Sequence, residues 1–269
     1  MSEKIRLDVL LHLKEHYDSR EKARRAIMAG NVMVDGELVD KAGTKVALTA
    51  HIQVKAKDPY VSRGGFKLEK ALSSFDLELV DLVCMDIGAS TGGFTDCMLQ
   101  SGARRVYAID VGYGQLDWRL RNDPRVVVME RTNFRILDTS LIEDVINFFS
   151  VDVSFISLKH IFPNVLLLSN PESILVTLIK PQFEAGRHQV GKHGLVKDPK
   201  IHLDVIQRVA HFAQDNAFKL VNLSYSPIRG AKGNIEYIAC FSREDSSSKM
   251  IGITEMQQVI NLAFDELNN

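Results

Sequence analysis

The sequence predicts an α/β protein: a mostly parallel sheet covered by helices on both faces, preceded in the chain by a smaller α+β module. Three observations lead to this prediction. From about residue 60 onward, short apolar runs alternate with segments of helical spacing, which is the pattern of repeated βα units. One apolar run, residues 83–87, leads through a glycine turn into a helix. Residues 1 to about 56 instead show two short helical segments followed by short alternating strands.

The change of pattern predicts two domains. Residues 1–58 form the small module and residues 59–269 the larger α/β domain. The linker is expected at about residues 56–64, where Pro59 and Gly64-Gly65 interrupt the periodic segments. A chain of 269 residues is long enough for one large α/β domain and one small module.

The small module begins with leucines at helical spacing over residues 7–13. Ser19 is a suitable N-cap for a second helix, which stops at Gly30. The dipeptide Asp35-Gly36 lies between two short alternating runs and predicts a β-hairpin. An alternating piece over residues 45–54 completes the module.

The larger domain contains seven apolar runs that we predict to be strands. The last two are joined by a loop alone, which indicates an antiparallel strand at the sheet edge. Helices fill the other gaps, including residues 200–216, and a helix over residues 254–267 closes the chain. The predicted strands are residues 83–87, 106–110, 126–129, 151–156, 174–179, 219–225 and 235–241.

Composition argues against several classes of protein. Apolar residues make up 45% and charged residues 25% of the chain, as in ordinary globular proteins. The sequence shows neither the apolar core of a secretory signal nor a run long enough to span a bilayer, so we expect a cytoplasmic protein that does not insert into membranes. A net charge of −1 confines any binding of polyanions to local basic patches.

Cysteine and histidine patterns give no sign of a metal site. The three cysteines, Cys84, Cys97 and Cys240, show no C-x-x-C spacing and are expected to be buried free thiols, as suits a reducing compartment. The eight histidines form no ligand motif. We therefore expect no metal.

The segment Asp86-Ile-Gly88-Ala-Ser90-Thr-Gly92-Gly93-Phe94 is the strongest functional signal. A buried strand leads through a glycine turn into a helix whose first N–H groups lack partners within the helix, which suits a nucleotide-type cofactor. A second strand ends at Asp110, about 20 residues beyond Gly88, where a carboxylate can reach ribose hydroxyls. Ser90 stands where a dinucleotide fingerprint has its second glycine. A cofactor without a pyrophosphate, such as S-adenosylmethionine, does not need that glycine.

Four polar residues lie where packing alone would not put them. Lys67 precedes the first helix of the larger domain, Asp152 and Glu236 lie within predicted strands, and Lys180 ends the most apolar strand. Because the carboxyl ends of parallel strands line one edge, we expect Asp152 and Lys180 near the glycine turn. Taken singly, each has a structural explanation: Lys180 could emerge to solvent, Asp152 could cap a loop, and Glu236 could face water from an edge strand.

Basic residues crowd one helix of the small module. The run from Ser19 to Gly36, with Asn31-Val-Met-Val-Asp inside it, resembles the RNA-binding module first known from ribosomal small-subunit protein S-four. The resemblance covers residues 5 to about 55 and implies a basic helix that faces phosphates, whereas charge clusters are usually solvated helix faces. The residues expected to bind RNA are Arg6, Arg20, Lys22, Arg24, Arg25 and Arg63.

The larger domain resembles the FtsJ-type 2′-O-ribose methyltransferases, and the whole chain resembles the TlyA family, also called hemolysin A. The match spans about residues 5–245, and only Lys192-His193-Gly194 departs from it, where the family more often shows a glycine-richer loop. Its landmarks here are Ser62-Arg-Gly-Gly-Phe-Lys67, Asp86 to Asp96, Ala108-Ile-Asp110 to Leu116, Asp152-Val-Ser154-Phe-Ile-Ser-Leu158, Lys180-Pro-Gln-Phe-Glu184 and Ser226 to Glu236.

This resemblance implies a class I, Rossmann-like methyltransferase that uses S-adenosylmethionine to modify the 2′-hydroxyl of a ribose, with cytidine the expected acceptor, in ribosomal RNA or ribosomal subunits. Lys180 would be the base or a cationic partner of the emerging alkoxide, Asp152 would orient it, and Lys67 and Glu236 would position the ribose. The sequence leaves open whether the protein is a monomer or a homodimer. The implied cofactor contacts are Asp86, Gly88, Ser90, Gly92, Gly93, Phe94, Asp110 and Asn133.

Three alternatives stand beside this hypothesis. A membrane-damaging toxin, as the name hemolysin implies, predicts a secretion signal and an insertion segment, neither of which the sequence shows. A non-catalytic RNA-binding assembly factor predicts the loss of a tetrad residue, yet all four positions are filled. An NAD-linked oxidoreductase is disfavoured by Ser90 and by the loop-only connection of the last two strands.

Overall fold

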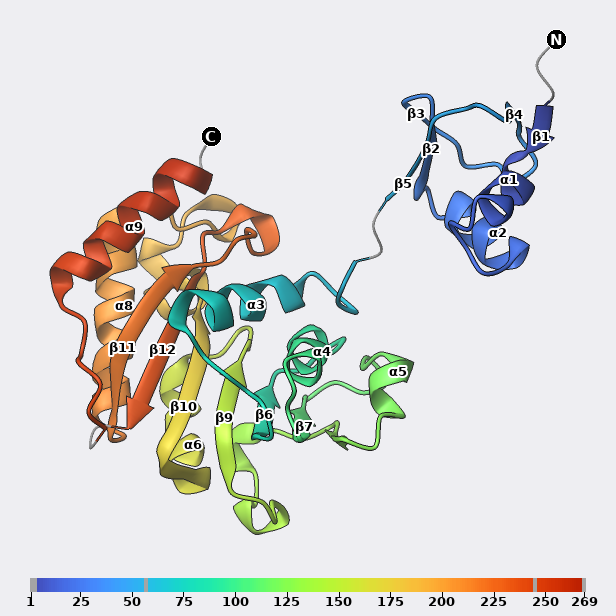
Figure 1. Ribbon diagram of the computed structural model, residues 1–269. Coiled ribbons are helices and arrows are strands. Elements are labelled where there is room, and N and C mark those ends of the chain that lie inside the picture. The colour runs from blue at the N-terminus through green and yellow to red at the C-terminus, as the bar shows by residue number, and fades with distance from the viewer. Residues whose placement is uncertain (1–3, 56–57, 244–245, 268–269) are drawn as a thin grey trace. The chain divides into compact units, whose positions relative to one another are not determined.

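A computed structural model of the chain describes residues 4–55, 58–243 and 246–267 (Figure 1). The chain divides into two compact units between Pro59 and Tyr60, and each unit has a hydrophobic core of its own. Within the described ranges, no helix has both the length and the apolar character needed to cross a bilayer.

The N-terminal unit combines two helices with two small antiparallel sheets. Ser19 caps the second helix as predicted, because its Oγ accepts from the N–H of Lys22 at 3.3 Å. The hairpin at Asp35-Gly36 is confirmed, with φ values of 53° and 86° at the two turn residues. The helices are α1 (Leu7–Leu13) and α2 (Arg20–Met28); β1 (Lys4–Arg6) pairs with β4 (Lys45–Ala47), and β2 (Val32–Val34) pairs with β3 (Glu37–Leu38) and β5 (Ile52–Val54).

The larger unit is built on a seven-stranded sheet with the order β11-β12-β10-β9-β6-β7-β8. Neighbouring strands are parallel except where β12 pairs, antiparallel, with both β10 and β11. The antiparallel strand is therefore not the edge strand that the sequence predicted, since a loop-only connection fixes the relative direction of two strands but not which one is outermost. The strands are β6 (Val83–Ile87), β7 (Arg105–Ile109), β8 (Val126–Met129), β9 (Ile146–Val151), β10 (Ser169–Ile179), β11 (Phe218–Tyr225) and β12 (Tyr237–Arg243).

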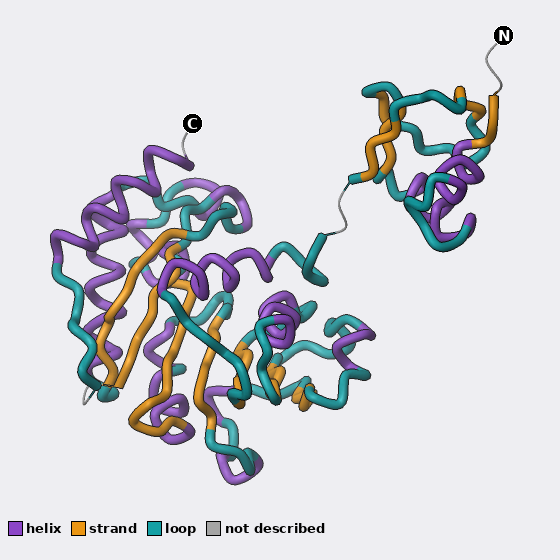
Figure 2. The backbone as a smooth tube through the Cα atoms, in the orientation of Figure 1, coloured by secondary structure: helices purple, strands orange, loops and turns teal. Residues whose placement is uncertain are grey.

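Helices cover both faces of this sheet (Figures 1 and 2). The strands alternate between the two layers: Met85 packs in the core beneath α8 and α9, whereas Cys84 packs in the core beneath α3 and α4. All three cysteines are free and buried, as predicted. The helices are α3 (Gly64–Phe75), α4 (Gly93–Gln100), α5 (Trp118–Arg121), α6 (Phe162–Leu168), α7 (Pro181–Glu184), α8 (Pro199–Gln214) and α9 (Ile253–Leu267), with short 3₁₀ turns at Phe134–Ile136, Thr139–Leu141, Leu158–His160, Arg187–Gln189, Lys192–Gly194 and Ala231–Gly233.

Several sequence-based placements differ from the structure by a few residues, and three of them concern candidate catalytic residues. β9 ends at Val151, so Asp152 lies in the following loop and not inside a strand; the strand is the preceding run, which is as apolar as the one we chose. β12 begins at Tyr237, so Glu236 directly precedes it. Lys67 lies inside α3 rather than before it. Asp152 and Glu236 therefore lie just outside their strands, and Lys67 lies near the start of α3.

One edge of the sheet gathers the candidate residues. Gly88, Asp110, Asp152 and Lys180 each follow directly on the carboxyl end of a parallel strand. Because β12 is antiparallel to β10 and its Tyr237 pairs with Ile179, the residue before β12 lies at the same edge.

Candidate active site

The glycine turn after β6 brings two loops into close contact. Gly88 has a φ of +89°, and a Cβ built on it would lie 2.5 Å from the carbonyl oxygen of Asp152, so a side chain at this position would collide with the backbone. The N–H of Ser90 donates to Asp110 Oδ2 at 2.8 Å, and the N–H of Gly112 donates to Oδ1 at 2.6 Å. The carboxylate that the sequence assigned to ribose binding is thus held by two backbone donors.

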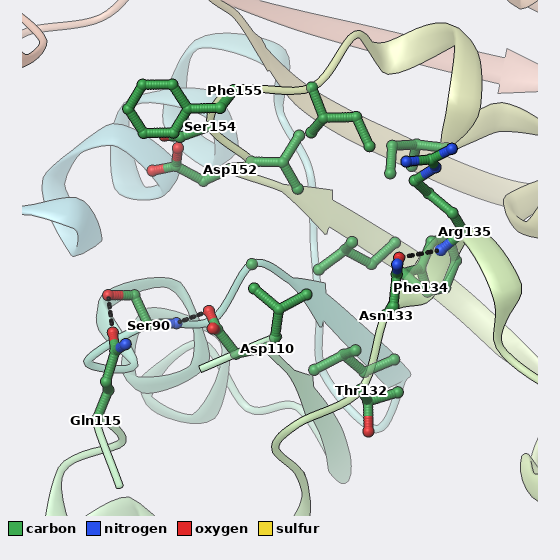
Figure 3. A pocket seen from close by; sticks show the side chains of 17 residues that line it. Ser90, Asp110, Gln115, Thr132, Asn133, Phe134, Arg135, Asp152, Ser154 and Phe155 are labelled. Atoms are coloured by element: carbon green, nitrogen blue, oxygen red, sulfur yellow. Dashed lines mark hydrogen bonds between the residues drawn. The ribbon is translucent and has the colours of Figure 1, made fainter. Parts of the chain in front are cut away.

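A cavity of about 540 Å³ lies beside this turn (Figure 3). Ser90 and Asp110 line one side of it, and Asp152, Ser154 and Phe155 line the other. Its apolar walls are Ile87, Ile109, Val111, Val153, Phe134, Ile156 and Ile161.

This cavity fits an adenosine-type cofactor. Its volume is within the usual range for small-molecule sites, and it combines apolar walls with a few fixed polar groups. Each oxygen of Asp110 accepts one backbone hydrogen bond, which leaves lone pairs for hydroxyl donors. Asn133 also lines the cavity, and its Oδ1 accepts from the N–H of Arg135 at 3.2 Å, which holds the side chain in place.

Two of the residues predicted to contact the cofactor, Asp86 and Gly92, line neither this cavity nor the one that adjoins it. Asp86 is fully buried and accepts from Thr95 N at 2.9 Å, Thr95 Oγ1 at 2.7 Å and Ser150 Oγ at 3.1 Å. Burial raises the pKa of Asp86 to about 7. A Cβ on Gly92 would lie 2.3 Å from Leu120, so this glycine permits close packing. Both residues therefore shape the start of α4.

A second cavity of about 400 Å³ adjoins the first. It is lined by Arg63, Lys67, Lys180 and Arg229, and also by Gly93 and Phe94 from the start of α4. The two cavities share four lining residues, Gly88, Ser90, Asp152 and Ser154. A ligand in the first cavity and a ligand in the second would therefore meet at the glycine turn and the loop after β9.

The four predicted catalytic residues form one chain of alternating charges. Lys180 Nζ lies 2.5 Å from Asp152 Oδ1, and Lys67 Nζ lies 3.8 Å from Asp152 Oδ2 and 2.8 Å from Glu236 Oε2. Lys67, Lys180 and Glu236 are buried, whereas the Asp152 side chain is 24% exposed. Two ammonium groups and two carboxylates compensate one another, which permits the burial of Lys67, Lys180 and Glu236 beside the partly exposed Asp152.

Neighbouring side chains that sequence reasoning did not assign complete this chain. Lys180 Nζ donates to Ser154 Oγ at 3.1 Å, and Gln182 Nε2 donates to Glu236 Oε1 at 3.3 Å. Ser154 follows Asp152 by two residues, and Gln182 follows Lys180 by two. This short spacing from a candidate catalytic residue is the signal by which sequence reasoning could have found them. Arg229 in the second cavity carried no comparable signal.

Phe155 is an exposed aromatic residue at the edge of the first cavity, and sequence reasoning did not assign it. Its side chain is 90% exposed, its backbone has a φ of 63°, and its ring lies 4.8 Å from the ring of Phe183, centroid to centroid. An unburied aromatic ring in a left-handed backbone conformation gains little for the fold. Its placement suits stacking on a ligand.

Glu184 fastens the loop that carries Asp152 to the helix that follows Lys180. Its carboxylate accepts from Ser157 Oγ and from the N–H of Leu158, both at 2.7 Å. Burial raises the pKa of Glu184, and these two hydrogen bonds oppose that shift. The two halves of the Lys180–Asp152 pair are thus held by a buried contact outside the cavities.

The residues predicted to bind RNA lie in different environments. In the N-terminal unit, Arg6 and Arg20 both pair with the buried carboxylate of Asp8, at 3.0 and 3.3 Å, and the hydrogen bond from Arg6 lowers the pKa of Asp8. Lys22 pairs with Asp18 at 2.5 Å, and Arg24 and Arg25 are exposed on α2. Arg63 belongs to the larger unit, where it lines the second cavity.

No group of three or more histidine, cysteine, aspartate or glutamate side chains in the described part of the chain is arranged to hold a metal ion.

Comparison with known families decides between the alternatives. The model described as FtsJ-like methyltransferase matches residues 60–243, and the model described as S4 domain matches residues 5–52. The chain belongs to the FtsJ-like methyltransferase family. An α/β methyltransferase unit with a preceding S4 domain confirms the predicted fold class.

Several relatives resemble most of the chain. YqxC of Bacillus subtilis (strain 168), named as an inferred rRNA methyltransferase, is 51% identical over 88% of this chain and 85% of its own length. The 16S/23S rRNA (cytidine-2'-O)-methyltransferase TlyA of Mycobacterium tuberculosis (strain ATCC 25618 / H37Rv) is 42% identical over 88% of this chain and 89% of its own. A solved structure of a candidate hemolysin from Streptococcus thermophilus has a TM-score of 0.76 and 44% identity, and the match covers 100% of this chain and 98% of that one. The family is therefore the TlyA group, for which hemolysin is another label.

Proposed function

We propose that the protein transfers a methyl group from S-adenosylmethionine to the 2′-hydroxyl of a cytidine ribose in ribosomal RNA. TlyA of Mycobacterium tuberculosis carries this activity in its name, and it resembles the chain over both units. The proposal includes the cytoplasm as its place of action and ribosomal RNA or ribosomal subunits as its partners.

The observation that carries this proposal is the position of the charge chain at the junction of two cavities. Asp152 and Ser154 line both cavities, and Lys180 and Lys67 line the second. We assign the first cavity to the cofactor because it holds Asp110, Asn133 and the apolar walls. The second cavity then receives the acceptor ribose, next to the residues that would act on its hydroxyl.

Methyl transfer to a 2′-hydroxyl requires an acceptor oxygen that is held in position. S-adenosylmethionine supplies an electrophilic methyl group on a sulfonium. The 2′-hydroxyl must lose its proton as the new oxygen–carbon bond forms, and this requires stabilisation of negative charge on the oxygen. An ammonium has three N–H donors; Lys180 uses one toward Ser154 and one toward Asp152, so a third can be donated to the acceptor oxygen.

We assign uptake of the acceptor proton to the Lys180–Asp152 pair. Asp152 is the most exposed member of the charge chain and lines both cavities, whereas Glu236 lines neither, so Asp152 is the carboxylate that the released proton can reach. Lys67, fixed by Glu236 at 2.8 Å, would hold the ribose in register. Gln182 in turn donates a hydrogen bond to Glu236 and so helps to hold Glu236 in place.

The N-terminal unit would supply RNA affinity. Arg24 and Arg25 are exposed on α2, and Asp8 holds Arg6 and Arg20 side by side. Arginines on one face neutralise phosphates and thereby set affinity and position more than sequence choice.

Methyl transfer from labelled S-adenosylmethionine tests the proposal. Unmethylated ribosomal subunits and deproteinised ribosomal RNA are offered to the wild type and to Lys180→Met. We expect label in the RNA with the wild type and a loss of about 100-fold or more with the variant, because a donor to the developing oxyanion is removed. If the folded wild type labels neither subunit nor free RNA, the proposed function is wrong.

A further inference from the structure

The methyltransferase unit carries a basic surface that the proposed function leaves unassigned. Two loops form it. The first comprises residues 191–197, and most of its residues line a cavity of about 410 Å³, separate from the two described above. The second comprises residues 229–233 and begins with Arg229, which lines the second cavity described above, called the catalytic cavity from here on. The second loop therefore extends from the acceptor site to the first loop.

A buried amide fastens the two loops to each other. Asn234 Nδ2 donates to the carbonyl oxygen of Gly194 at 2.8 Å, and its Oδ1 accepts from the N–H of Val196 at 3.1 Å. Asn234 is 3% exposed, and its own carbonyl accepts from the N–H of Gly230 at 2.9 Å. The relative position of the loops is thus set by buried hydrogen bonds and does not depend on their surface charges.

Each loop presents a basic residue in a left-handed conformation. His193 has a φ of 64° and Lys232 a φ of 65°. Such a conformation is unfavourable for a residue with a side chain, and it persists where the surroundings enforce it. Lys232 reaches the other loop, since a Cβ built on Gly194 would lie 3.9 Å from its Nζ. The cations of both loops therefore gather at one place.

Positive charge predominates on this surface. Lys192, Lys197 and Lys232 are exposed, and none of them forms an ion pair with a carboxylate in the described ranges. The carboxylate lining the same cavity is Asp198, which accepts from the N–H of Lys200 at 2.9 Å as the N-cap of α8. Three lysines and a histidine beside one carboxylate suit a polyanion.

We propose that residues 191–197 and 229–233 together form a phosphate-binding surface that holds the RNA backbone next to the nucleotide in the catalytic cavity. This inference rests on the proposed function, because it takes RNA as the occupant. The surface belongs to the methyltransferase unit and acts in addition to the basic helix α2. Lysines that neutralise phosphates fix the register of the strand, and so determine which ribose faces Lys180.

The test compares two full-length variants that remove the same charge. Lys192→Gln/Lys232→Gln changes the proposed surface. The matched control is Arg104→Gln/Lys249→Gln, at two exposed positions that line none of the three cavities described above. Binding of a fluorescein-labelled oligoribonucleotide is followed by anisotropy over a series of salt concentrations. Two lost contacts to a single strand should lower affinity on the order of 10-fold and reduce the slope of log K against log salt by about 1.4. Affinity for S-adenosylmethionine should not change.

The outcomes separate this surface from the proposed function. If Lys192→Gln/Lys232→Gln keeps the affinity and the salt slope of the control, the surface does not bind RNA. If the lysine pair changes the slope as expected while the wild type transfers no methyl group to RNA, the surface stands and the proposed activity fails. Thermal unfolding of each variant shows whether a loss of affinity reflects a loss of fold.

Discussion

Asp152 Oδ1 lies 2.5 Å from Lys180 Nζ, at the point where the two cavities of the methyltransferase unit join. The two residues come from loops after neighbouring parallel strands, β9 and β10. Gly88 permits the loop of Asp152 to approach the glycine turn, and Glu184 ties it to the helix after Lys180. The pair is thus positioned by contacts on both sides.

Asp152→Asn removes the charge that lies between the two lysines. We expect methyl transfer to fall by about 100-fold or more, because Lys180 loses the partner that orients it. Affinity for S-adenosylmethionine should change little, since Asn keeps the shape of the cavity wall. Single-turnover rates and calorimetric binding measure the two effects. Asp204→Asn, on the exposed side of α8, is the matched control and should keep the wild-type rate.

Lys180→Arg separates the two roles that the sequence left open for this residue. Arginine keeps the cation and the N–H donors but cannot act as a base. If Lys180 acts as a donor to the emerging alkoxide, Lys180→Arg should retain measurably more activity than Lys180→Met. Equal loss in the two variants at every pH would instead favour a neutral lysine base.

Gly230→Ala tests the support of Glu236. A Cβ at this position would lie 2.0 Å from Glu236 Oε1, so the carboxylate must leave the position in which its other oxygen, Oε2, contacts Lys67. We expect a lower rate of methyl transfer at saturating RNA with unchanged cofactor affinity. A wild-type rate in Gly230→Ala would show that the position of Glu236 is not important for the reaction.

Phe155 should contribute to substrate binding and not to stability. Its ring is 90% exposed, so Phe155→Ala removes little buried area and should leave the thermal midpoint nearly unchanged. If the ring stacks on a base, the ratio kcat/KM for RNA should fall by about 10-fold. Phe155→Trp should restore most of it. Equal kcat/KM values in Phe155→Ala and the wild type would exclude stacking.

Asp86 should make stability depend on pH. Burial raises its pKa in the folded protein to about 7, whereas the unfolded carboxyl titrates near 3.8. The folded state therefore binds the proton more tightly, and the contribution of Asp86 to stability is full below the unfolded value and is lost as pH rises toward 7. Chemical denaturation at several pH values should show this decline. In Asp86→Asn that part of the pH dependence should disappear.

The sequence was sufficient for the parts of the site that follow strand ends. Gly88, Asp110 and Lys180 follow apolar runs whose ends are marked by glycine or charge, and the structure places all three at one edge. The end of β9 and the start of β12 were misjudged, because apolar content alone does not show where in a buried run a strand begins or stops. Asp86 was assigned to the cofactor from its place in the motif, whereas its contacts with Thr95 and Ser150 depend on tertiary packing.

The residues that sequence reasoning did not assign depend on contacts between distant segments. Arg229 lines the catalytic cavity because the loop before β12 packs against Glu236 at Gly230. No residue spacing in the sequence indicates that contact. Asn234 joins two loops through hydrogen bonds to Gly194 and Val196. A one-dimensional pattern shows strand ends and helix faces, but it does not show which loops meet.

The most direct test of the central claim is the chemical position of the transferred methyl group. Ribosomal RNA treated with the wild-type protein and S-adenosylmethionine is digested to nucleosides and analysed by mass spectrometry. The charge chain at the junction of the two cavities predicts 2′-O-methylcytidine with the wild type and almost none with Lys180→Met. Methyl groups found only on bases, or 2′-O-methylcytidine formed equally by the variant, would contradict it.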